Sequence, residues 1–201
     1  TLHDCNQLKD LTPLLECTKL TKLYLPIAAT NVAILQQHPM LTTLAFYPAL
    51  MPLSPPERTR SEFFRIGVEV MRELAKSEYL LLEAIQLRQQ SKHQEALELF
   101  KSSLAIKTKH LAPDDPSLGT VEMLFGDTYE RLNEIPDAIL HYERCLAILR
   151  KSKWTPDVHL EIDRTLKSLA QLYEKNGDPD KARTFTEELN ERQRELPKPK
   201  N

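Results

Sequence analysis

The chain has 201 residues, of which 41% are hydrophobic and 28% are charged, and its net charge is −2. Acidic and basic residues are interleaved, so the sequence lacks the basic stripe that binds nucleic acid, and no apolar run is long enough to span a membrane. The chain has only four glycines, which argues against glycine-rich phosphate loops, and its three widely spaced cysteines favour a reducing, cytoplasmic compartment.

The first repeat pattern lies in residues 1–48, where two segments match with an offset of 21 residues. The matched apolar positions are Leu20, Leu23 and Leu25, then Leu41, Leu44 and Phe46. This LxxLxL spacing predicts a short parallel strand in each segment and a return turn or short helix over 11–17 and 32–38. Two units are too few to bury a core by themselves, so either the array continues upstream of Thr1 or this end packs against the residues C-terminal to it.

A proline-rich joint covers residues 49–56, where Pro52, Pro55 and Pro56 block both helix and inner strand. Apolar residues spaced by three and four positions then predict a helix over 57–76. This helix either breaks near Ser77 or continues beyond it, and we expect it to cap the helical repeats on its C-terminal side.

A second repeat pattern covers residues 77–196, where Ala96, Ala138 and Ala182 each follow a small residue by twelve positions. Spacings of 42 and 44 residues between these alanines predict helix–turn–helix repeats stacked into a solenoid. Prolines and capping residues set the limits of the predicted helices, which cover 78–90, 93–109, 117–132, 135–151, 157–175 and 179–195. The predicted N-caps include Asp115, Thr155 and Asp178. A proline-broken tail covers 197–201.

These residues resemble the tetratricopeptide repeat family over about residues 78–195. The family's small residue, aromatic residue, turn glycine and alanine are matched by Ala84–Leu87–Ser91–Ala96, Gly126–Tyr129–Asn133–Ala138 and Ala170–Tyr173–Gly177–Ala182. The resemblance implies a mainly α superhelix of three repeats, in which paired helices cross closely at the small residues. The long period resembles the kinesin light chain type, although Leu82, Leu124 and Ser168 stand where that type carries a peptide-binding asparagine.

The N-terminal segment resembles the leucine-rich repeats of large bacterial proteins, which implies a small α/β segment before the helices. In some of these proteins, including bacterial serine/threonine kinases, a proline-rich joint and an EFF-type segment follow the repeats. Residues 61–64 (SEFF) resemble that segment.

The tetratricopeptide resemblance also implies where a partner would bind, because the family uses the concave face formed by the first helix of each pair. Carried over by position, the candidate partner-binding residues are Arg88, Gln89, Met123, Asp127, Glu130, Arg131, Arg164, Lys167, Gln171, Glu174 and Lys175. The third repeat contributes mostly basic residues, so we expect a peptide with its acidic end near Arg164 and Lys167. The alternative is an ordinary solvated helix face.

Two further features have both structural and functional interpretations. His141 and Cys145 have the spacing of metal ligands, but Cys145 falls at a small-residue packing position, so we predict a core contact there and no metal site. Trp154, the single tryptophan, is predicted to pack over its loop and hold the second and third repeats together. A binding anchor is the alternative for this residue.

The sequence therefore predicts a non-catalytic protein–protein interaction scaffold without a cofactor, since it has no phosphate loop, nucleophile motif or positioned acid–base pair. We expect a protein or peptide partner, with neither nucleic acid nor membrane, and stacking of solenoid ends would permit a homo-oligomer. The alternative is a regulatory or recruitment tail of a larger bacterial enzyme, such as a serine/threonine protein kinase. In that case the catalytic domain lies upstream of Thr1.

Overall fold

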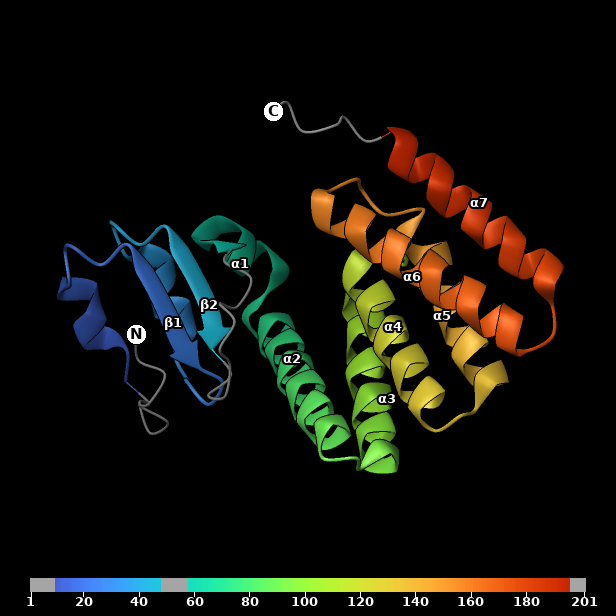
Figure 1. Ribbon diagram of the computed structural model, residues 1–201. Helices are drawn as coiled ribbons and strands as arrows, with labels where there is room; N and C mark the ends of the chain where they lie inside the picture. The colour runs from blue at the N-terminus through green and yellow to red at the C-terminus, as the bar shows by residue number, and fades with distance from the viewer. Residues whose placement is uncertain (1–9, 48–57, 196–201) are drawn as a thin grey trace. The chain divides into compact units, whose positions relative to one another are not determined.

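The computed structural model describes residues 10–47 and 58–195 of the chain (Figure 1). The predicted joint over 49–56 and the predicted tail over 197–201 lie outside the described residues. Contacts between residues divide the chain into two units, residues 1–86 and 87–201. None of the helices in the described ranges has both the length and the apolar character needed to cross a membrane.

The first unit begins with a two-turn coil that contains parallel strands. Strands β1 (Lys22–Pro26) and β2 (Thr43–Tyr47) pair in parallel, and Leu23 stands opposite Leu44 in a register offset by 21 residues. Short 3-10 helices, η1 (Thr12–Glu16) and η2 (Val32–Gln37), provide the return segments. The predicted strands and return turns are thus confirmed, and the assignment to the leucine-rich class stays a prediction.

The coil is closed by the residues on its C-terminal side. Strand β3 (Arg58–Thr59) pairs antiparallel with β2, and helix α1 (Arg60–Ile66) brings the buried ring of Phe63 to 5.5 Å from that of Phe46. The Arg72 side chain donates hydrogen bonds to the carbonyl oxygens of Ile27 (3.0 Å) and Ala29 (2.7 Å). Of the two sequence-based alternatives, the structure therefore shows the coil packed against the segment C-terminal to it.

The helix expected over 57–76 differs from the observed one in its continuity. It is interrupted at Gly67, whose φ of 104° ends α1 because side-chain-bearing residues rarely adopt such a value, and it resumes as α2 (Val68–Gln89). The expectation that it caps the helical repeats concerns the other unit and stays a prediction. The contacts of α1 are with β2, β3 and η2, because Phe63 completes the apolar core of the coil.

The second unit is a row of antiparallel helices, each packed on the next along the chain (Figure 1). The helices are α3 (His93–His110), α4 (Pro116–Arg131), α5 (Ile135–Leu149), α6 (Pro156–Lys175) and α7 (Pro179–Glu195). Pro116 and Pro156 each occupy a first turn, where a missing N–H breaks no bond. The predicted N-caps Asp115 and Thr155 accept backbone N–H groups at 2.9 and 3.1 Å. The predicted mainly α fold is confirmed.

Three equivalent turn residues join the helices of each pair. Ser91, Asn133 and Gly177 have φ values of 62°, 60° and 79°, so a serine and an asparagine adopt the conformation for which glycine is best suited. After each turn, the next backbone N–H bonds to the carbonyl oxygen five residues back, as Glu134 does to Tyr129 at 3.0 Å. This bond closes the helix end as a Schellman motif does. Each of the three repeats therefore has the same turn conformation and the same backbone hydrogen bond at this point.

The core of the second helix pair shows why a small residue recurs at the crossing. A Cβ atom on Gly126 would lie 2.9 Å from three ring carbons of Tyr142, a distance that real Cβ contacts do not reach. A Cβ on Gly119 would similarly lie 2.8 Å from the Leu149 side chain. The predicted close crossing at Gly126 is therefore present, and it is filled by the ring of Tyr142. The corresponding contact predicted between Ala84 and Ala96 joins residues on the two sides of the unit boundary and stays a prediction.

Candidate protein-binding surface

Four of the candidate partner-binding residues pair with each other inside the helical unit. Arg88 Nη1 lies 3.1 Å from Asp127 Oδ2, and only 15% and 25% of the two side chains are exposed. Lys175 Nζ lies 3.4 Å from Glu130 Oε1. Both pairs join successive repeats, so they contribute to the packing of the solenoid and leave less charge available to a partner.

Asp127 is also the centre of a hydrogen-bonded cluster. Its Oδ1 accepts the Tyr142 hydroxyl at 2.5 Å while its Oδ2 faces Arg88. Burial, followed by the negative charge of Asp127, raises the pKa of Tyr142, so the phenol remains a proton donor at neutral pH. The cluster fixes the Tyr142 ring over Gly126.

Met123 also differs from its expected role, because it is 5% exposed and belongs to the apolar core of the helical unit.

The six remaining candidates have exposed side chains: Gln89, Arg131, Arg164, Lys167, Gln171 and Glu174. The last four are on α6 and are spaced by three and four positions, so they share one helix face. Leu160, four positions before Arg164, is 62% exposed and extends the same face. We call these five residues the α6 stripe.

The charges of the α6 stripe are available to a partner. Arg164 and Lys167 form no ion pair with another residue among those the structure describes. Burial raises the pKa of the neighbouring Glu161 carboxyl, while hydrogen bonding by Thr120 and the positive charge of Arg164 act in the opposite direction. The stripe therefore presents an apolar end at Leu160, two cations in the middle and a mixed polar end at Gln171 and Glu174.

The polar end of the α6 stripe continues into an open groove of about 870 Å³ between α6 and α7. Its lining includes Ala170, Ala182 and Thr186, with Gln171 and Arg183 at the rim. The two helices are the last antiparallel pair of the unit, drawn in orange and red in Figure 1. Sequence reasoning did not find this groove, although the exchange of an aromatic residue for Thr186 in the third repeat was a signal for it.

Trp154 was predicted to pack over its loop, and the structure shows that this expectation was wrong. The side chain is 67% exposed. Polar contacts hold the loop without it: the Ser152 hydroxyl donates to the Asp114 carbonyl oxygen at 2.6 Å, and Thr155 caps α6. The indole therefore remains exposed beside the N-terminal end of α6.

Cys145 is a core residue, as predicted, and His141 is partly buried. The His141 ring stacks 4.7 Å from Phe125, and its Nδ1 lies 2.6 Å from a Glu122 oxygen. Cys145 is fully buried, and burial raises the pKa of its thiol to about 12, so it stays protonated at neutral pH. Within the described ranges, no group of three or more His, Cys, Asp or Glu side chains could hold a metal ion.

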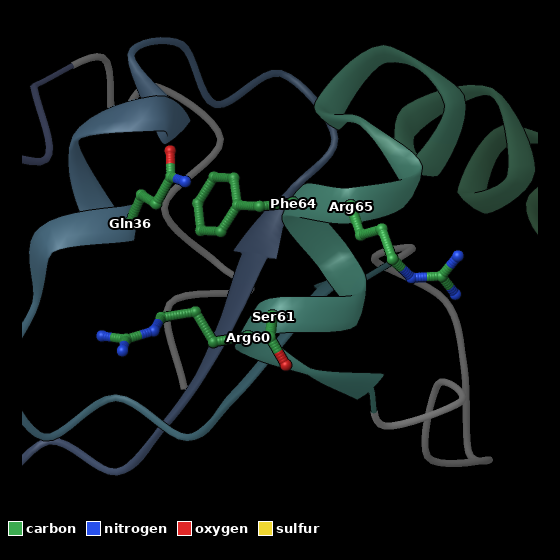
Figure 2. A pocket seen from close by; sticks show the side chains of 5 residues that line it. All are labelled: Gln36, Arg60, Ser61, Phe64 and Arg65. Atoms are coloured by element: carbon green, nitrogen blue, oxygen red, sulfur yellow. The ribbon is translucent and has the colours of Figure 1, made fainter.

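A second pocket, of about 450 Å³, lies in the N-terminal unit beside α1 (Figure 2). Its two arginines do not converge on one point. Arg60 donates to the His38 carbonyl oxygen, and the Arg65 guanidinium points away from Gln36 and Phe64. Polar groups that diverge in this way do not form an anion site, so the helical unit carries the better candidate surface.

The helical region is similar to known repeat proteins. Residues 76–151 match the tetratricopeptide repeat family, a match that covers less than half of the chain. No protein with a curated description matches the sequence.

Two solved structures share the fold at low sequence identity. BtubC (BKLC) from P. vanneervenii is 17% identical with a TM-score of 0.58, and the match covers 71% of this chain and 60% of that one. The kinesin light chain nearly identical TPR-like repeats from Podosopora anserina are 22% identical with a TM-score of 0.50, covering 64% of this chain and 58% of that one. The chain thus spans about three fifths of the length of the solved structures it matches. The similarity extends to tetratricopeptide and kinesin light chain type repeats, which generally mediate protein–protein contacts.

Proposed function

We propose that this chain is a non-catalytic, cytoplasmic protein-interaction module whose recognition surface is the α6 stripe. Its ligand is an acidic extended or helical segment of a partner protein. The observation that carries the proposal is the contrast in charge pairing along the candidate face. Arg88, Asp127, Glu130 and Lys175 are used within the solenoid, whereas Arg164 and Lys167 are exposed without an ion pair among the described residues.

The arrangement of the α6 stripe indicates how such a segment would be oriented. Two cations one helical turn apart attract carboxylates and set the register of the ligand, while exposed Leu160 offers apolar contact at one end. Exposed Trp154 lies in the loop six positions before Leu160 and is a second exposed apolar side chain near the start of α6. Rim charges of this kind act mainly on association rate and specificity, so binding should weaken as salt concentration rises.

The test is an affinity capture with the chain as bait, comparing Arg164→Glu plus Lys167→Glu with a matched charge reversal. The matched variant is Arg144→Glu plus Lys151→Glu, because these exposed cations also lack an ion pair among the described residues. We expect the first variant to lose the partners that the wild type and the matched variant retain, with unchanged circular dichroism. Equal recovery by all three proteins would contradict the α6 stripe as the recognition surface.

A second candidate function keeps the same surface but places the chain in a larger bacterial protein. The SEFF resemblance supports a regulatory or recruitment segment of an enzyme such as a serine/threonine kinase. The reading frame upstream of Thr1 tests it, and an initiator methionine without a further domain would contradict it. Sedimentation at high concentration tests the homo-oligomer expected from stacked solenoid ends, and a strictly monomeric chain would contradict that expectation.

A further inference from the structure

His38 ends η2 and is fully buried, and both nitrogens of its ring have partners. Nδ1 lies 3.2 Å from the backbone nitrogen of Met40 and 3.0 Å from that of Leu41. Nε2 lies 3.0 Å from the carbonyl oxygen of Leu14 in η1. The ring therefore connects the return segment of the first turn of the coil to the chain that enters strand β2.

These partners allow only one protonation state of the His38 ring. Backbone N–H groups only donate, so Nδ1 must accept from Met40 and Leu41 and carries no proton. The carbonyl oxygen of Leu14 only accepts, so Nε2 must carry the proton that it donates. A second proton, placed on Nδ1, would point at two N–H groups and would break both hydrogen bonds. The contacts are therefore compatible with the neutral imidazole alone.

The charged groups around His38 do not favour a charged ring either. Arg60 of α1 donates to the His38 carbonyl oxygen, so the charged side chain in contact with this residue is itself a cation. Asp10 and Glu16, near the two ends of η1, are exposed, and so is Arg65 on α1. Within the described ranges, no carboxylate forms an ion pair with the His38 ring. A buried imidazolium would therefore lose water without gaining a compensating charge.

We propose that His38 is a pH-sensitive clasp, which keeps the N-terminal coil closed at neutral pH and releases it in mildly acidic conditions. An imidazole in an unfolded chain takes up a proton near about pH 6.5. Because the closed coil accommodates only the neutral ring, whereas the open coil accommodates both forms, proton uptake favours the open coil. The stability that the clasp contributes is therefore fully present above about pH 6.5 and is lost as the pH falls below that value.

Release of the clasp would open the apolar core of the coil to water. Leu11, Leu35 and Leu41 are close in sequence to the residues that the ring connects, and they are exposed by only 0%, 0% and 2%. All three belong to the apolar core of the coil. The clasp lies in the N-terminal unit and the α6 stripe in the helical unit, so failure of the clasp would leave the proposed function standing.

Amide hydrogen exchange of the full chain tests the clasp at about pH 7.5 and about pH 5.5, since an imidazole changes its charge between them. Rates are expressed as protection relative to an unfolded peptide at the same pH. The N–H of Leu41 reports on the coil, and the N–H of Glu134, bonded to the Tyr129 carbonyl oxygen at 3.0 Å, reports on the helical unit. We expect the protection of Leu41 to fall about tenfold between the two conditions, while that of Glu134 stays constant.

His38→Asn is the conservative variant, because an asparagine oxygen can accept the N–H groups of Met40 and Leu41 but takes up no proton in this range. Its Leu41 protection should be equal at the two pH values. His110→Asn, at the end of α3, is the matched control and should keep the wild-type fall. Three results would overturn the clasp: no fall in the wild type, an equal fall in His38→Asn, or a fall shared by Glu134.

If His38→Asn does not fold, the nitrogen NMR spectrum of the wild-type imidazole rings decides. The clasp predicts a proton on Nε2 of His38 at neutral pH, and loss of Leu41 protection at the pH where this ring takes up its second proton. A proton on Nδ1 at neutral pH would contradict the clasp. A ring that becomes charged while Leu41 stays protected would contradict it equally.

Discussion

The second and third helix pairs carry the same repeat pattern and yet differ in how many of their side chains are buried. The second helices of the pairs show the difference: α5 has six buried residues between Ala138 and Leu149, whereas in α7 Ala182 is the one buried residue among the side chains described. The second pair is covered on both sides by neighbouring helices, because α4 packs on α3 and α5 packs on α6. The comparison shows that the pattern specifies the helix pair, whereas the next repeat is what completes the burial of its outer face.

The largest difference in stability between the pairs should appear when the side chain at the aromatic position is truncated to alanine. Tyr142→Ala should lower the free energy of unfolding by about 3–5 kcal/mol, since it removes a buried ring and leaves Asp127 without its donor. Thr186→Ala, at the equivalent exposed position, should change it by less than about 0.5 kcal/mol. Urea unfolding of the two variants measures both values. Similar losses would show that α6 and α7 are closed in the same way as α4 and α5.

A somewhat smaller effect is expected at the helix crossing. Gly126→Leu should destabilise the chain by about 3 kcal/mol, because even a Cβ atom there meets the Tyr142 ring at 2.9 Å. Ala170→Leu should cost less than about 1 kcal/mol, since its side chain enters the open groove. Thermal unfolding followed by circular dichroism compares them. Equal destabilisation would mean that the groove is not open in solution.

The inter-repeat ion pair provides a third comparison. Asp127→Ala should cost about 2 kcal/mol, because it leaves the largely buried Arg88 guanidinium and the Tyr142 hydroxyl without an acceptor. Gln171→Ala, at the equivalent position, should change stability by less than about 0.5 kcal/mol. Urea unfolding is again the measurement, and an unchanged midpoint for Asp127→Ala would contradict a packing role for this cluster.

The smallest predicted effect depends on pH. Burial raises the pKa of Glu161 in the folded chain, so the ionised carboxylate is less favourable there than in the unfolded chain. Glu161→Gln should therefore stabilise the chain at pH 7 by a few tenths of a kcal/mol. The gain should disappear as the pH falls through the acid range and the wild-type carboxyl takes up its proton. Unfolding curves at several pH values test this, and a gain that grows on acidification would contradict the sign.

Local signals in the sequence were sufficient to predict most of the backbone. Helix limits followed from Pro116, Pro156 and their N-caps, and the 21-residue offset reappears as the strand register of β1 and β2. Each of these signals acts within a few residues or through a strict period. The strand pair and the helices were therefore predictable without knowledge of distant contacts.

The elements that the sequence did not predict depend on contacts between distant residues. Strand β3 forms because β2 leaves an edge free, and α1 covers the coil because Phe63 fits against Phe46. The pairing of Arg88 with Asp127 joins residues 39 positions apart, close to the repeat spacing. Opposite charges about one repeat apart in the sequence were a signal for this pair. The repeats were aligned by equivalent position, however, and this alignment treats the two residues as separate members of one binding face and not as partners.

The central claim is that recognition takes place on the open third pair and not on the closed second pair. Amide chemical-shift mapping of the full chain with an acidic peptide tests it most directly. The account predicts perturbations along the α6 stripe, with little change at Asp127 or Glu130. Perturbations centred on α4, with α6 and α7 unaffected, would contradict it.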